Sequence, residues 1–497
     1  LVLTDAVTLM ATTVTTEAIS GAHNLTVTGN ADINGAVAVN DLLVSGDSAF
    51  ASTVNAKVMT LDGTALINGV VTADSLVING TADLGADVTT TGAQHYIGAV
   101  SLLTDLNLTG SKVTTNALTG AHNLTVTGVA DINDAVNIRD LTVSEDATFT
   151  STVTASDISI GGDAVINDVV VADSLSVAGT SDLAADVTTS STQSYTGAMA
   201  LNNDVILTGT TITTDAVTGA HNLTLAGNAD INGVMDVNDL SVSGAAAFAT
   251  ALYADAISIG GTADFDGAVS ADSLAITGNT HAGADITTIT VQNYNGAVVL
   301  TDAITLKATT VTTNAINGAH NLTVTGNADI NGAVAVNDLS VSGNSTFAAI
   351  VNADTIDIGG NAIINEVVTA HSLDIAGTSS IGADITTTGT QNYTGALALT
   401  DGVTLAGTTV TANSVTGAHN LSVSGNADLN GRVIVSDLIV SGDVVIEGAI
   451  LADSLSIGGM TDLGANVTTD TTQTYGGDVS LTGDSTLTGS AVNFNGA

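Results

Sequence analysis

The segment from residue 25 to residue 80 carries one short motif four times: apolar residue, any residue, apolar residue, any residue, glycine. The copies read Leu25-Thr-Val-Thr-Gly29, Leu42-Leu-Val-Ser-Gly46, Met59-Thr-Leu-Asp-Gly63 and Leu76-Val-Ile-Asn-Gly80, and each glycine stands 17 positions after the last. Alternation of this kind, rich in Val, Ile, Leu and Thr, indicates β-strands. Such a step is too short for a strand–helix–strand unit, which needs about 30 residues. The motif therefore predicts a chain that winds upon itself in short coils, a parallel β-helix.

A longer repeat contains the short one. Gly-Ala-His-Asn-Leu occurs five times with a period of 99, with its histidines at His23, His122, His221, His320 and His419. A Gln-x-Tyr pair keeps the same period at Gln94, Gln193, Gln292 and Gln391, but its fifth copy, Gln473, arrives 17 positions early. The early copy indicates that one coil has been deleted there. A fixed period along the whole chain predicts a repeat architecture.

These periods predict one continuous β-solenoid over residues 1–497, with about 17 residues per coil and six coils per 99-residue repeat. The expected divisions are a partial unit at 1–22, four units at 23–121, 122–220, 221–319 and 320–418, and a shorter, truncated unit at 419–497. The glycines Gly80, Gly98 and Gly110 are 18 and then 12 positions apart, so the division of residues 80–110 into coils stays open.

The composition excludes several kinds of chemistry. The chain has no Cys and no Pro, and only 2% of its residues are aromatic. Without Cys there is no disulfide framework and no thiolate site. The absence of Pro suits a backbone that is hydrogen-bonded nearly throughout. Ser, Thr and Asp are abundant, but none stands in the local frame of a known nucleophile, and we expect no enzymatic activity.

The charge balance limits the possible partners. Five Lys and Arg residues stand against 49 Asp and Glu residues, giving a net charge of −44. Nucleic acids and anionic membranes are poor partners for such a surface because they require basic residues. No apolar stretch approaches the roughly 18 residues of a membrane span, so we expect no membrane insertion. Copies should repel one another unless divalent cations or salt screen the charge.

Two recurring polar features are candidate sites. The histidines follow Gly-Ala and precede a strand, and we interpret them as turn residues. Asp239, Asp255 and Asp272 fall at one expected corner on three successive coils, and we predict that this column binds a cation, Ca²⁺ before others. The alternative is a solvated row of acids. The corresponding sets are Asp41, Lys57 and Asp74 in the first unit and Asp338, Asp354 and His371 in the fourth.

The segment Thr386-Thr-Thr-Gly-Thr-Gln-Asn-Tyr-Thr-Gly395, with Leu405-Ala-Gly-Thr-Thr-Val410 and Asn420-Leu-Ser-Val-Ser-Gly-Asn-Ala-Asp428, resembles filamentous-haemagglutinin-like and autotransporter-type bacterial surface proteins with β-strand repeats. The resemblance covers essentially the whole chain. It implies a right-handed parallel β-helix that is secreted or displayed on the bacterial cell surface, for adhesion or for building a sheath or matrix.

We therefore expect an extracellular structural rod, part of a fibre, sheath or surface layer, that self-associates end to end or laterally. The alternative is an adhesin stalk that presents a tip to a host, a surface or a neighbouring cell. Surface glycans and cations are further possible partners, and a flat Thr-rich face leaves ice or carbohydrate binding as a third hypothesis. Asn24, Asn123, Asn222 and Asn321 each begin an Asn-Leu-Thr glycosylation sequon, which we interpret first as strand structure.

Overall fold

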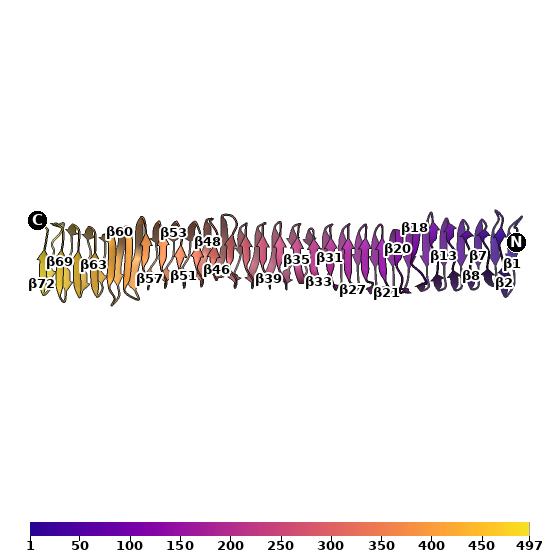
Figure 1. Cartoon of the computed structure of the whole chain (residues 1–497), viewed down its shortest axis with the longest axis horizontal. Helices are drawn as coiled ribbons and strands as arrows, with labels where there is room; N and C mark the ends of the chain where they lie inside the picture. Colours follow the sequence, from indigo (N-terminus) through magenta and orange to yellow (C-terminus); the bar gives the residue numbers. More distant parts are fainter. Residues whose placement is uncertain (497) are drawn as a thin grey trace. The chain divides into compact units, whose positions relative to one another are not determined.

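The computed structural model describes residues 1–496, and these residues form β-strands and no helix. The chain divides into two compact units, Leu1–Ala246 and Ala247–Ala497. Each unit is a stack of parallel strands wound as a β-solenoid, as the ribbon in Figure 1 shows. The predicted parallel β-solenoid is confirmed, with equivalent strands about 17 positions apart on successive turns.

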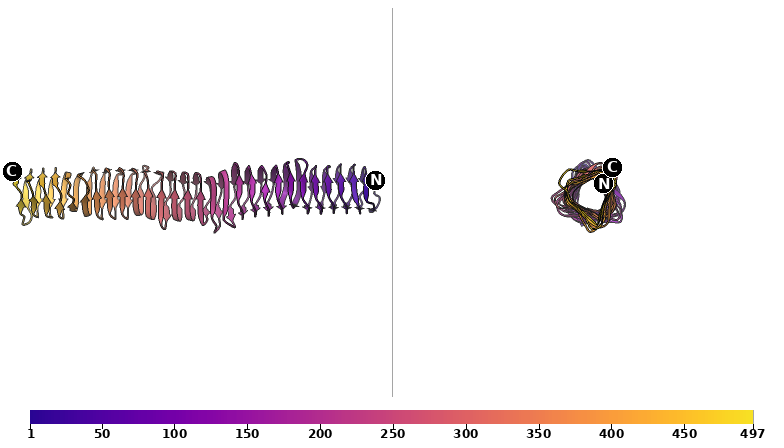
Figure 2. Two further views of the ribbon diagram at one scale, coloured as in Figure 1. Left: turned by 90° about the horizontal axis from the view of Figure 1, so that it is seen from below. Right: turned by 90° about the vertical axis from the view of Figure 1, so that its left-hand side faces the viewer.

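Three strands make one turn of the solenoid, and each strand pairs with the strand one turn further along. In the N-terminal unit β4 pairs with β7, β5 with β8 and β6 with β9, all in parallel, so that Leu25 lies opposite Leu42. These strands are β4 (Leu25–Val27), β5 (Asn30–Ile33), β6 (Val37–Ala38), β7 (Asp41–Val44), β8 (Ser48–Phe50) and β9 (Val54–Asn55). Each turn therefore has three faces, and the side view in Figure 2 shows the strands of each unit stacked turn upon turn.

The core is a set of stacked apolar ladders. Alternate residues of each strand point inward, so Val27, Val44, Leu61 and Ile78 lie above one another on successive turns and are fully buried. Larger rings fill the interior at intervals, including Phe248 and Phe265, whose centroids are 5.4 Å apart. Burying each such side chain contributes about 1.5–3 kcal/mol, so the ladders supply most of the stability.

One repeat does not contain a whole number of turns. Residues 23–121 hold sixteen strands, from β4 to β19 (Leu118–Gly120), and β18 (Leu106–Thr115) contributes to two faces, which gives 17 strand segments. Its first half pairs with β15 (Val88–Thr90) and its second half with β16 (Ala93–Tyr96). Because a turn uses three segments, each 99-residue repeat makes five and two-thirds turns, fewer than the six that we predicted.

The pairing also divides residues 80–110. Between Gly80 and Gly98 lie three segments, β14 (Ala82–Leu84), β15 and β16, which form one complete turn. Between Gly98 and Gly110 lie only two, β17 (Val100–Leu102) and the first half of β18. The shorter step is thus two-thirds of a turn, and it is the source of the fractional count.

Because of this fraction, equivalent residues of successive repeats lie on different faces. The ladder that starts at Leu25 runs through Gln94 and Val113 and reaches Ala130 after six turns, not Leu124. In the N-terminal unit the strands after His23, His122 and His221 therefore occupy the three faces in turn. In the C-terminal unit the strands after His320 and His419 likewise occupy two different faces.

The deletion in the shorter fifth repeat does not change the face on which each later strand lies. The stretch missing from it corresponds to residues 344–360 of the fourth repeat. That stretch holds three segments, β51 (Ser345–Phe347), β52 (Val351–Asn352) and β53 (Thr355–Ile358). Loss of three segments removes one whole turn, so everything that follows stays on its original face.

Candidate functional site

The Gly-Ala-His-Asn motif forms a sharp corner that leads into a strand, as predicted. Its glycine has a positive φ, between 131° and 152°, in all five copies: Gly21, Gly120, Gly219, Gly318 and Gly417. A Cβ at Gly21 would lie 2.2 Å from the carbonyl oxygen of Leu3, one turn away. Only glycine therefore fits this corner, both for its backbone conformation and for its close approach to the previous turn.

The histidines at these corners are partly exposed and lie near acids in two copies. His122 Nδ1 is 3.4 Å from Asp105 Oδ1, and His221 Nδ1 is 3.8 Å from Asp204 Oδ1. The pKa of Asp105 is lowered chiefly by a hydrogen bond from the backbone N–H of Asn123 and further by His122. Exposed pairs of this kind contribute little to stability. Within each unit, successive histidines are about 27 Å apart along the axis at about 4.8 Å per turn, so they cannot share one site.

The structure places the predicted cation residues as follows. Asp239 begins β37 (Asp239–Val242) in the N-terminal unit, whereas Asp255 in β39 (Leu252–Ile259) and Asp272 in β41 (Val269–Ile276) belong to the C-terminal unit. Asp255 and Asp272 are exposed and occupy equivalent positions one turn apart, between pairs on either side that are in register. They form a stacked pair of like charges.

The fourth repeat shows why the predicted columns are incomplete. Asp338 pairs with Thr355, not with Asp354, and its Oδ1 accepts a hydrogen bond from Thr355 Oγ1 at 2.7 Å. Stacked residues in this part of the repeat differ by 17 positions, whereas Asp338 and Asp354 differ by 16. Asp239 and Asp255 also differ by 16. Among residues 1–496 no three Asp, Glu or His side chains are grouped as a metal site.

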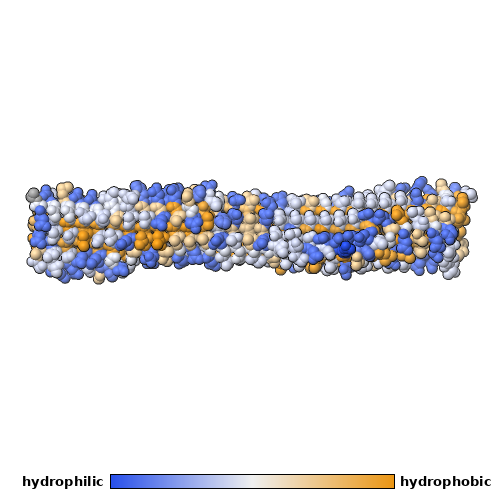
Figure 3. Space-filling view, viewed as in Figure 1, coloured by the Kyte–Doolittle hydropathy of each residue, from blue (hydrophilic) through white to orange (hydrophobic). Residues whose placement is uncertain are grey.

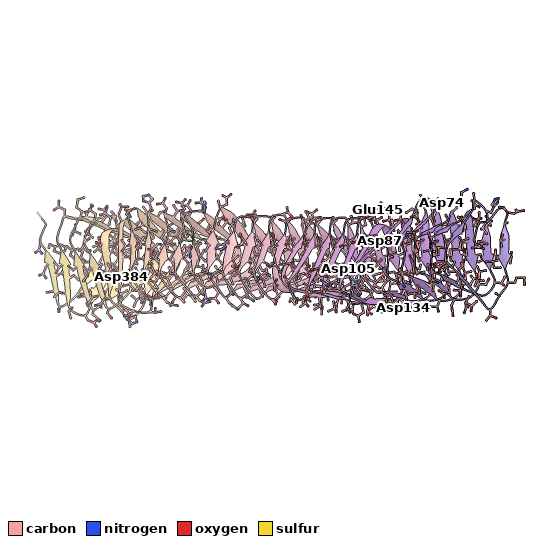
Figure 4. The ribbon with its side chains drawn as sticks, turned by 45° about the vertical axis from the view of Figure 1, so that its right-hand side comes forward. Asp74, Asp87, Asp105, Asp134, Glu145 and Asp384 are labelled. Atoms are coloured by element: carbon pink, nitrogen blue, oxygen red, sulfur yellow. The ribbon has the colours of Figure 1, made fainter. Side chains whose placement is uncertain are left out.

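Many aspartates accept hydrogen bonds at the corners of the turns, and Figure 4 labels several of the acidic residues. Asn30 Oδ1 accepts a hydrogen bond from the backbone N–H of Asp47 at 3.0 Å, and Asp47 Oδ1 accepts one from Thr64 at 2.9 Å. Each bond joins one turn to the next. The short Asp and Asn side chains reach this N–H, which explains why Asp outnumbers Glu by 45 to 4. Other aspartates, such as Asp302, accept a bond from the next backbone N–H of their own turn.

The Gln-x-Tyr pair, which we used only as a marker of the period, is a buried polar cluster. Gln94 Nε2 donates to the carbonyl oxygens of Val88 at 3.1 Å and Thr109 at 2.7 Å, and Tyr96 Oη donates to Gln94 Oε1 at 2.9 Å. The same three kinds of bond recur at Gln193, Gln292, Gln391 and Gln473. Burial raises the pKa of the Tyr96 hydroxyl far above its ordinary value.

This cluster stands where the turn widens. Val88 pairs with Leu108, which is 20 positions later, and the register shifts between Thr109 and Lys112. A Cβ at Gly110 would lie 2.7 Å from Thr90 Oγ1, so the chain passes tightly around the cluster. The glutamine amide satisfies carbonyl groups beside this irregularity. Since Gln94 is fully buried, the cluster is a structural element without access for a substrate.

Shallow grooves recur at the corner between the third strand of one turn and the first strand of the next. Two of them have volumes of about 420 Å³ and floors of small residues, Ala155 and Ala172 in the second repeat and Ala353 and Ala370 in the fourth. Their rims are polar and include the pair of His371 Nδ1 and Thr388 Oγ1, 2.8 Å apart. Within each unit, the face drawn in Figure 3 mixes hydrophilic and hydrophobic residues.

No family model, curated protein or solved structure matches this chain. In the described part of the chain there is no helix of the length and hydropathy needed to cross a membrane.

Proposed function

We propose that this chain is a non-catalytic structural element of an extracellular bacterial surface, part of a fibre, sheath or surface layer, in which copies associate with one another. One observation carries the proposal. Strand follows strand through short corners along each unit, and the buried Gln-x-Tyr clusters bond the main chain of the solenoid itself. Such a molecule gains length with every added turn, about 4.8 Å each, and this is the property that a fibre or sheath requires.

The acidic net charge supports an assembly in which association between copies depends on ions. None of the acidic side chains of residues 1–496 is buried, and only five basic residues are available to neutralise them. Two such surfaces repel at low ionic strength and approach one another once salt or divalent cations screen the carboxylates. The corner role of Asp explains why this charge persists, because replacing it would remove hydrogen bonds between turns.

Electron microscopy of the producing cells with an antibody against this chain tests the proposal. Continuous filaments, sheaths or lattices carrying the label are the expected result. Label confined to isolated projections would favour the adhesin stalk instead, and label inside the cell would contradict both. Sedimentation of the purified chain with and without Ca²⁺ at about 5 mM, enough to saturate weak extracellular sites, measures association independently of location. A chain that stays monomeric throughout contradicts self-association.

A further inference from the structure

We propose that the asparagine of each Gly-Ala-His-Asn corner is a site of N-linked glycosylation. The five candidates share the sequence Asn-Leu-Thr or Asn-Leu-Ser and are listed here by position: Asn24, Asn123, Asn222, Asn321 and Asn420. This sequence is the acceptor pattern for a glycan on the asparagine amide nitrogen. The structure shows how that amide is oriented and which bonds the hydroxyl two residues later makes.

The oxygen of the amide is held by the solenoid in four of the five copies. Asn24 Oδ1 accepts a hydrogen bond from Asn40 Nδ2 at 2.7 Å, and Asn321 Oδ1 accepts one from Asn337 Nδ2 at 2.6 Å. Asn222 and Asn420 accept from the backbone N–H groups of Asp239 and Asp437, both at 3.2 Å. In the second copy, Asn123 Oδ1 is buried and has no hydrogen-bond partner.

The nitrogen of the same amide is left for another partner. In residues 1–496 the Nδ2 atoms of these five asparagines donate no hydrogen bond within the chain, and Asn24, Asn321 and Asn420 are exposed. Because the oxygen faces the next turn, the nitrogen on the opposite side of the planar amide faces away from it. The corner therefore holds the side-chain amide in one orientation, with Nδ2, the atom that would carry the glycan, directed away from the next turn.

The hydroxyl of the sequon has no structural task of its own. Thr26 lies in β4 with its side chain outward, and its hydroxyl makes no hydrogen bond among the described residues. On the next turns the same outward position holds Leu43, Thr60 and Val77, so the strand does not require a hydroxyl there. In the five corner copies the residue is nevertheless always Thr or Ser, ending with Ser422. A sequon requires this choice, and the fold alone does not.

The chemistry needs a partner enzyme and an activated sugar. The Nδ2 nitrogen would attack C1 of a sugar carried on a phosphate or pyrophosphate. The N–C1 bond forms while the bond from C1 to the phosphate oxygen breaks, the phosphate leaves with the electron pair, and an Nδ2 proton passes to a base of the transferase. Since the repeat turns by one face each time, glycans on Asn24, Asn123 and Asn222 would project from all three faces of the N-terminal unit, about 27 Å apart along its axis.

The chain supplies its own internal controls. Five further asparagines begin sequons: Asn79, Asn107, Asn344, Asn392 and Asn466. Of these, Asn79 and Asn392 are the controls, because their Nδ2 atoms donate to Asp62 Oδ1 at 2.7 Å and to Asp374 Oδ1 at 3.2 Å. If the orientation of the amide selects the acceptor, these two asparagines stay unmodified while the corner asparagines carry glycans.

Mass spectrometry of the chain purified from the cells that produce it tests the proposal. We expect peptides containing Asn321 and Asn420 to carry added hexose or hexosamine mass, and peptides containing Asn79 and Asn392 to carry none. Thr323→Val removes the sequon hydroxyl from an outward position and should abolish the added mass on Asn321, whereas Thr323→Ser should keep it. Asn420→Asp keeps the Oδ1 acceptor, so the corner should still fold. It removes the amide nitrogen, so no mass should be added at this position.

Three results would overturn the proposal: unmodified masses at all five corner peptides, full modification of Thr323→Val, or equal modification of Asn79 and Asn392. Circular dichroism of each variant verifies that the solenoid is intact. None of these outcomes bears on whether the chain assembles into a fibre or layer.

Discussion

Tyr96 Oη donates a hydrogen bond to Gln94 Oε1 at 2.9 Å inside the core of the solenoid, where both side chains are at most 2% exposed. The two residues belong to one strand, β16, and both point inward because they are two positions apart. The pair closes a network that ties the glutamine amide to two main-chain carbonyls beside the widened turn. A polar cluster therefore sits at the place where the winding departs from its regular period.

Replacing one glutamine of this network should destabilise its surroundings. Gln292→Leu leaves the carbonyls of Ile286 and Lys307 and the hydroxyl of Tyr294 without their partner, and we expect a cost of about 2–4 kcal/mol. Tyr294→Phe removes one hydroxyl only and should cost about 1 kcal/mol. Hydrogen exchange of residues 286–313, followed by mass spectrometry, measures both. Equal protection in the Gln292→Leu variant and the unaltered chain would contradict a structural role.

The buried tyrosines should make the fold sensitive to alkali. Burial raises the pKa of Tyr96 well above its ordinary value of 10.0 and that of Tyr475 to about 12. The folded state holds these protons more tightly than the unfolded state. The resulting stabilisation is complete below about pH 10 and is lost as the pH rises above it, by about 1.4 kcal/mol per pH unit for each tyrosine. Tyrosine absorbance and far-ultraviolet circular dichroism should therefore change together; ionisation of the buried tyrosines in a folded chain would contradict this.

The corner glycines should tolerate no side chain. Gly417 has φ 152°, and a Cβ there would lie 2.6 Å from the carbonyl oxygen of Leu399. We expect Gly417→Ala to cost about 2 kcal/mol or more, through backbone strain and displacement of the neighbouring turn. At Gly402 the nearest atom, the carbonyl oxygen of Asn420, is 4.0 Å from the same position. Gly402→Ala should change the melting temperature little, and a similar loss in both variants would contradict the reason given.

Deletion of one whole turn should preserve the fold. Removing residues 344–360 joins Gly343 to Asn361 and takes out three strand segments, as the fifth repeat already does. We expect the melting temperature and the exchange protection of residues 361–420 to stay close to those of the full chain. Removing only residues 344–349 takes out one segment and moves everything after it to the wrong face. Comparable stability of the two deletions would show that turns are not built from three segments.

The stacked pair of Asp255 and Asp272 allows a test of cation binding. Equivalent positions one turn apart are about 4.8 Å from one another, and carboxylate oxygens at such a distance suit Ca²⁺. We expect Ca²⁺ to raise the melting temperature of the chain and Asp255→Asn with Asp272→Asn to reduce that rise. Asp302→Asn, at an exposed corner where the carboxylate accepts a bond from Ala303, is the matched control. Absence of binding heat in calorimetry would leave the pair as a screened like-charge contact and end the cation hypothesis.

The candidate sites differ in how far the sequence could reveal them. The Gly-Ala-His-Asn corner was predictable because its glycine and its strand are local features. The burial of Gln94 had a signal that we did not use: Gln94 and Tyr96 stand at the same distance after Leu76 and Ile78, so both continue apolar ladders. The cation column was only partly right, because a spacing of 16 places Asp338 one position away from the ladder of Asp354.

The sequence by itself determined that the chain is all-β, that it coils with a short, regular period and that apolar side chains alternate toward one core. These properties follow from the local alternation of apolar and polar residues, as in Leu25-Thr-Val27, and from a period that can be counted. The number of strands per turn and the face on which each repeat lies were decided by the tertiary structure. The physical reason is that Val88 pairs with Leu108, and Gln94 with Val113, only after the corner lengths and the buried glutamine have set the register between turns.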